Sequence, residues 1–297
     1  MKRDETKYGG WTFVMEHQYQ AGFDEMSRQL SSTGADRVLL ANRGTAALCL
    51  GRLDQAREDF LQANSLSEEE SGGHSSPYRE SLFAVEWISG NFEKAIAHLV
   101  STLEGLKKGR LHYADLAGGV GSGALLYFAS IRRGDDALKE VAGAYLRDLA
   151  ANPRSVYWPG PLGAFLLGAT NFDELLKRVG ISESVERLPV AARESLRDRG
   201  HRWVKAVGIS RPKKERLPGS ARESLLDRGL LEAKTGVLLR RQLCQALFYR
   251  AVKTLEQNDT EGAIAQFADC SALENPLLEV EWFLADFELK TLRGSRK

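Results

Sequence analysis

The chain has 297 residues, which is enough for one large domain or two ordinary ones with a sizeable core. Its 43% hydrophobic and 27% charged residues are close to average usage, which excludes a disordered chain. Lys and Arg together number 41 against 40 for Asp and Glu, so no net field favours nucleic acid or an anionic membrane as the main partner.

Targeting signals and cysteines indicate the compartment. The first residues, MKRDETKYGG, are charged where a secretory signal has an apolar core, and no window approaches about eighteen uninterrupted apolar residues. Cys49, Cys244 and Cys270 are odd in number, widely separated and within apolar helical patterns, which favours buried thiols in a reducing compartment over a disulfide framework. We therefore expect a cytoplasmic protein with no membrane segment.

The periodicity predicts an all-α chain. Ala, Leu, Glu, Arg and Gln fill long segments in which apolar residues recur every three or four positions, and breakers separate helices of about ten to eighteen residues. The order is helix, turn, helix, repeated, beginning with a partial pair around Gly22. A regular array of helix pairs is the natural prediction.

The clearest pair is RVLLANRGTAALCLGRLDQAREDFLQANSL at 37–66. Gly44 is a small residue at the helix crossing, Gly51 supplies the backbone freedom of the turn, and Phe60 follows on the second helix to fill the space between the two. A second pair is expected at 77–106, where Gly90 and Phe92 take corresponding places.

Less regular pairs are expected at 114–149 and 158–179. The first contains AGGVGSGA at 117–124, which has the spacing of a dinucleotide-binding glycine pattern but follows no convincing strand. Close helix packing or an anion site at a helix N-terminus are the alternatives there.

A duplicated stretch follows. ERLPVAARESLRDRG at 186–200 returns almost unchanged as ERLPGSARESLLDRG at 215–229. Each copy predicts a short helix from its proline to its closing glycine, so 180–235 is interpreted as a charged, tandem-duplicated helical insertion. Its excess of basic residues leaves contact with an acidic surface or nucleic acid open.

The last pair is expected at 245–273, with Asn258 at the turn and Cys270 at a packing position where a small residue is usual. The segment 276–292 then predicts a capping helix, because an array of repeats must end with a polar outer face.

The pattern of small residue, turn glycine, alanine, aromatic and alanine in these units resembles the tetratricopeptide repeat family, specifically over 37–106 and 245–273. The resemblance implies an α-solenoid of antiparallel helix pairs that forms one domain over 1–297, with the first helices lining a concave face. It also implies a non-catalytic adaptor or scaffold that binds a protein or peptide on that face.

Carrying the family's groove positions onto the matching units points to Thr45, Glu80, Trp87, Gln245 and Phe248 as partner-binding residues. Trp87 and Phe248 are interpreted as groove anchors, with a place in the core as the alternative.

Two other functions remain open: an immunity-type inhibitor that sequesters a toxin domain, and a nucleotide-binding or hydrolytic enzyme on an α-solenoid. The sequence predicts no cofactor, because the histidines stand apart and no Cys-x-x-Cys pair, phosphate loop or nucleophile elbow is present. The oligomeric state is left open.

Overall fold

The structure, a computed structural model, describes residues 9–74, 77–112, 117–179, 237–273 and 278–294. Its helices are α1 (Gly9–Met15), α2 (Tyr19–Thr33), α3 (Arg37–Cys49), α4 (Leu53–Glu70), α5 (Arg79–Ile88), α6 (Phe92–Lys107), α7 (Val120–Arg133), α8 (Asp136–Ala150), α9 (Gly160–Leu166), α10 (Phe172–Arg178), α13 (Val237–Glu256), α14 (Thr260–Ser271) and α15 (Val280–Gly294), with a 3₁₀ turn at Pro153–Val156. These ranges contain no strand, so the all-α prediction is confirmed. The duplicated insertion at 180–235 lies outside the described residues.

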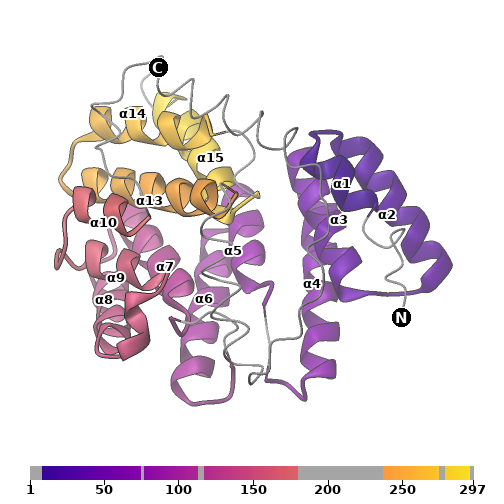
Figure 1. The fold of residues 1–297 in the computed structure, drawn as a ribbon, viewed down its shortest axis with the longest axis horizontal. Helices are drawn as coiled ribbons and strands as arrows, with labels where there is room; N and C mark the ends of the chain where they lie inside the picture. Colours follow the sequence, from indigo (N-terminus) through magenta and orange to yellow (C-terminus); the bar gives the residue numbers. More distant parts are fainter. Residues whose placement is uncertain (1–8, 75–76, 113–116, 180–236, 274–277, 295–297) are drawn as a thin grey trace, which may run out of the picture.

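Consecutive helices pack in antiparallel pairs, α1 with α2, α3 with α4, α5 with α6, α7 with α8, and α13 with α14 (Figure 1). Each pair also packs on its neighbour through α2–α3, α4–α5 and α6–α7. Because one helix pair cannot bury its own apolar side, stacking the pairs is what creates a continuous core.

Local chemistry explains the best-matched pair, α3 and α4. Asp36 caps α3 by accepting hydrogen bonds from the backbone N–H groups of Val38 and Leu39. At the crossing, a Cβ on Gly44 would lie 3.1 Å from Cε1 of the Phe60 ring, so glycine lets the ring pack here without shifting. The turn residue Gly51 has φ +71°, as the sequence predicts.

The same turn conformation is held without glycine in the last pair. Asn258, between α13 and α14, has φ +62°. On the facing helices, Cys244 and Cys270 are both fully buried, with their Sγ atoms 3.6 Å apart. Asn and Cys therefore serve the turn and packing roles at these positions.

The N-terminal pair differs from the prediction. The break lies at 16–18, where His17 has φ +63°, and not at Gly22. Gly22 is buried inside α2, where an added Cβ would meet the carbonyl oxygen of Gly10 at 2.8 Å. This glycine serves close helix packing because α1 crosses α2 at that point.

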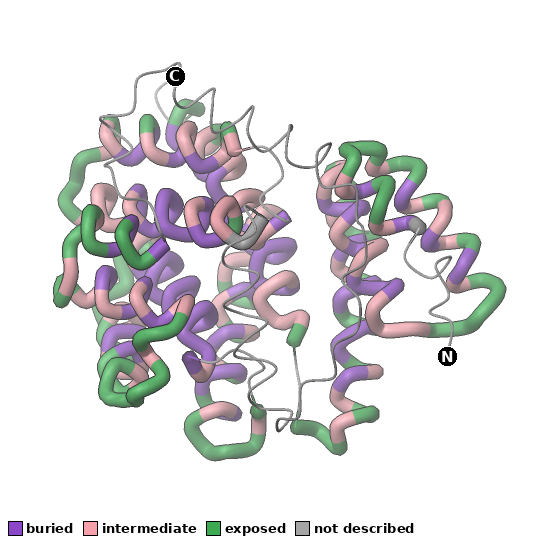
Figure 2. The backbone as a smooth tube through the Cα atoms, in the orientation of Figure 1, coloured by how far each residue is buried: buried purple, intermediate pink, exposed green. Residues whose placement is uncertain are grey.

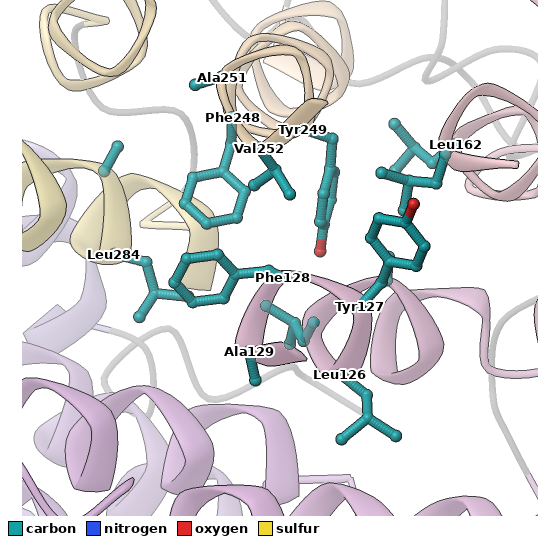
Figure 3. Packing of buried hydrophobic residues seen from close by; sticks show 14 of the residues in the cluster. Leu126, Tyr127, Phe128, Ala129, Leu162, Phe248, Tyr249, Ala251, Val252 and Leu284 are labelled. Carbon is teal, nitrogen blue, oxygen red and sulfur yellow. The ribbon is translucent and has the colours of Figure 1, made fainter. Parts of the chain in front are cut away.

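The main core extends from α5 to α15 and is rich in aromatic residues. Figure 3 shows Phe128 of α7 facing Phe248 of α13, with Leu284 of α15 beside them. Buried residues run along the inward-facing sides of the helices, whereas exposed residues gather at their outer sides and loops (Figure 2).

Helix α15 packs on α14 and α13 and also reaches back to α5 (Figure 1). Leu278, Trp282 and Phe283, at and before its start, pack against apolar residues of the N-terminal pairs. Further along α15, the fully buried Glu288 accepts a hydrogen bond from Nε1 of Trp87 at 3.0 Å and pairs with Nε of Arg132 at 2.5 Å. Helix α15, which was expected only to cap one end of the array, therefore also contacts the helices in the middle of the array.

Candidate partner-binding site

The five residues expected to bind a partner lie in different environments. Trp87 is 1% exposed and Phe248 is fully buried, so neither can touch a partner in this arrangement. Their prediction as groove anchors is wrong, and the alternative place in the core holds for both. Thr45 is half-buried on α3, where its Oγ1 donates to the carbonyl oxygen of Ala41 at 3.0 Å.

The chain's own helices cover these two aromatic side chains. The ring centroid of Phe128 lies 5.0 Å from that of Trp87 and 5.0 Å from that of Phe248. Phe83 and Phe267 extend the cluster to α5 and α14. Aromatic side chains of α5, α7, α13 and α14 thus fill the space around Trp87 and Phe248 that the resemblance left to a bound partner.

Glu80 and Gln245 share one polar site. Glu80 of α5 lies near Glu279, which precedes α15, and Glu281 of its first turn, and we name these three residues the inner acidic cluster. Gln245 of α13 donates from Nε2 to Oε2 of Glu279 and to Oε1 of Glu281, both at 3.2 Å. Its Oε1 accepts the indole N–H of Trp158 at 2.7 Å.

Two further groups of α13 complete the site. Nε of Arg241 pairs with Oε1 of Glu279 at 2.7 Å, and the arginine side chain is 47% exposed. The hydroxyl of Tyr249, which is fully buried, donates to Oε1 of Glu281 at 3.1 Å. The site is therefore buried at Glu281 and Tyr249 and reaches solvent at Arg241.

Burial controls the protonation of this site. Loss of hydration raises the pKa of Glu281 to about 8, and the neighbouring Glu279 carboxylate adds to the rise. Burial also raises the pKa of Glu279 to about 7, against the opposing charge of Arg241. Burial keeps the pKa of the Tyr249 hydroxyl well above its usual value, so that hydroxyl stays a donor.

The glycine string at 117–124 packs against the inner acidic cluster. Oγ of Ser122, in the first turn of α7, donates to Oε1 of Glu80 at 2.7 Å. A Cβ on Gly121 would lie 3.0 Å from that same Glu80 oxygen, and one on Gly123 would lie 2.9 Å from Cδ1 of Tyr145. A carboxylate at this helix end repels a phosphate, so the glycines serve close packing and the nucleotide-binding alternative loses its site.

A shallow groove of about 700 Å³ lies elsewhere, between the turns that precede α4 and α6. Its lining residues are Gly51, Arg52, Leu53, Asp54, Gln55, Arg57, Ser89 and Asn91. Within it, Arg57 donates to Glu86 at 2.9 Å and to Ser89 at 3.0 Å and pairs with Asp54. These charges are largely satisfied within the groove.

In the part of the chain that the structure describes, no group of three or more His, Cys, Asp or Glu side chains is placed to hold a metal ion. Among the same residues, no helix is both long and apolar enough to cross a membrane.

Sequence reasoning missed most of the polar site. Glu279 and Glu281 lie in a segment interpreted only as a cap, and their i, i+2 spacing matches no helical face. The signal that could have found them is a pair of acids at the start of an otherwise apolar run.

Neither a family model nor a curated protein matches the sequence. Among solved structures, a tetratricopeptide repeat protein from Parabacteroides merdae is similar over 95% of this chain and 98% of its own, with a TM-score of 0.41 and 14% identity.

Proposed function

We propose that this chain is a non-catalytic protein-interaction module that binds a protein or peptide on the concave face expected from the first helices of its pairs. We call this face the inner side. The observation that supports this is the stack of antiparallel pairs from α1 to α8, because such stacks present extended surfaces for binding a partner. The buried aromatic cluster restricts the surface on which a partner can dock.

We take the rims of this inner side as the surface that a partner reaches. Thr45 and Glu80 are partly exposed on α3 and α5, and Arg241 is exposed at the start of α13. Gln245 is 7% exposed and fully engaged in hydrogen bonds, so it acts by positioning the acidic groups beside it. A partner that docks here therefore meets charged and polar side chains.

The test is partner capture followed by a measured affinity. The partner is identified by crosslinking and copurification, and its Kd is then measured for the wild type, Thr45→Arg and Arg241→Gln. We expect each variant to weaken binding by about tenfold or more, since an inserted charge or a lost charge at an interface costs about 1.4 kcal/mol or more.

The matched control is Leu61→Arg, which adds the same charge on α4 at a residue that is 48% exposed. Equal affinities for all four proteins would exclude the inner rims as the binding site. The same partner decides the inhibitor alternative: if it is a toxin enzyme and its activity falls on binding, the module is an immunity-type inhibitor.

We also propose a cytoplasmic location, because three widely separated cysteines, two of them fully buried, are typical of thiols in a reducing compartment.

A further inference from the structure

The segment from Leu278 to Phe283 lies between two parts of the molecule. Leu278, Trp282 and Phe283 pack on the N-terminal helix pairs. Glu279 and Glu281 instead reach Gln245 of α13. We name these six residues the closing segment, because its contacts join the C-terminal helices to the start of the array.

Burial and a neighbouring carboxylate favour the neutral form of Glu281, against the hydrogen bonds that it accepts. The residue is 3% exposed, and its carboxyl group accepts hydrogen bonds from Gln245 and Tyr249, which are uncharged donors. These donors offset only part of the cost of burying a carboxylate, because neither carries a positive charge. The nearby Arg241 is paired with Glu279 instead.

Carboxyl groups approach Glu281 from two sides. Glu80 faces it from α5 and Glu279 from the preceding turn, and both raise its pKa, while on α13 Arg241 pairs with Glu279 and Tyr249 and Cys244 are neutral. Two carboxyl groups share one nitrogen, Nε2 of Gln245. Like charges this close cannot all be ionised without cost, so the closed arrangement retains at least one proton.

We propose that the inner acidic cluster is a proton-sensitive clasp that holds the closing segment in place while protonated and releases it when fully ionised. Release separates α15 from the N-terminal pairs and uncovers the inner side of α3 and α5. The clasp is a property of the isolated chain and does not depend on the proposed partner.

The direction of the pH dependence follows from burial. In the folded state the pKa of Glu279 is about 7 and that of Glu281 is about 8, and both lie above the value of 4.5 in the unfolded chain. The folded state therefore binds more protons, its stabilisation is complete below pH 4.5, and it is lost as pH rises through 7 to 8.

Hydrogen–deuterium exchange of the purified full-length protein tests this, with exchange rates corrected for the intrinsic effect of pH. We expect the protection of amides in α15 to fall by about tenfold or more between pH 6 and pH 8.5, because one unit of pKa difference is a tenfold change in an equilibrium. Amides in the middle of α7 serve as the internal reference.

Glu281→Gln keeps the shape of the neutral acid and removes one of the two titrating groups, so we expect the protection of α15 to fall less than in the wild type as pH rises to 8.5. Glu69→Gln, at an exposed position of α4, is the matched control and should follow the wild type. A flat wild-type profile overturns the proposal whether or not the variant folds. A Glu281→Gln profile as steep as that of the wild type also overturns it. Glu279→Gln, which removes the other titrating carboxyl group, is measured in the same way.

Discussion

Replacing Trp87 measures how much the packing of α15 on α5 contributes to the free energy of unfolding. The indole ring lies 4.8 Å from Phe92, 5.0 Å from Phe128 and 5.5 Å from Phe83, measured between ring centroids, and its N–H bonds the buried Glu288. Deleting a buried Trp ring costs about 3–5 kcal/mol. Leaving a buried carboxylate oxygen without its donor adds about 1–3 kcal/mol.

Trp87→Phe helps to separate these two contributions, since it keeps a smaller ring in the cluster and removes the donor. We expect Trp87→Phe to lower the free energy of unfolding by about 1–3 kcal/mol and Trp87→Ala by about 4 kcal/mol or more, a large part of the 5–15 kcal/mol of an ordinary domain. Urea unfolding followed by far-ultraviolet circular dichroism measures both. A loss of less than about 1 kcal/mol in Trp87→Ala would show that α15 does not cover this side chain in solution.

The other predictions concern the same core and use the same unfolding assay. Glu288→Ala should lower the free energy of unfolding by about 3–5 kcal/mol, because Arg132 is left without its partner. The double variant Arg132→Leu with Glu288→Leu should recover most of that loss. An equal loss in the single and the double variant would contradict the pairing. Gly143→Ala should stabilise α8 by about 0.5–1 kcal/mol, since its Cβ meets only the flexible end of Arg147, but Gly44→Ala should give no such gain because Phe60 is in the way. Phe248→Ala should cost about 3–5 kcal/mol, and a smaller effect would mean that the cluster repacks.

The helix pairs could be predicted because their signals are local. Gly51 and Asn258 adopt the left-handed conformation expected at the turns, and Gly44 meets Phe60 as its spacing implies. These residues interact within a few turns of one another, so periodicity and turn chemistry are sufficient. At Gly22 the same reasoning failed, because a buried crossing glycine and a turn glycine are indistinguishable without the partner helix.

The site could be predicted only in part. Groove and core positions of a repeat helix are both apolar, so the pattern around Trp87 and Phe248 fits either environment. What decides between them is α15, whose contact with Trp87 joins residues 201 positions apart. No spacing rule spans that separation. The polar groups around Gln245 were missed for the same reason, since they come from four separate helices and the turn before α15.

Contacts between α15 and α5 also affect how the chain reaches its native state. Arrays of repeats fold by nearest-neighbour propagation, but here the middle pairs need a helix that is synthesised about two hundred residues later. Until α15 leaves the ribosome, the side of α5 that carries Phe83 and Trp87 lacks its final cover. The long sequence separation slows closure and prolongs the exposure of an aromatic surface, which makes the partly folded chain prone to aggregation.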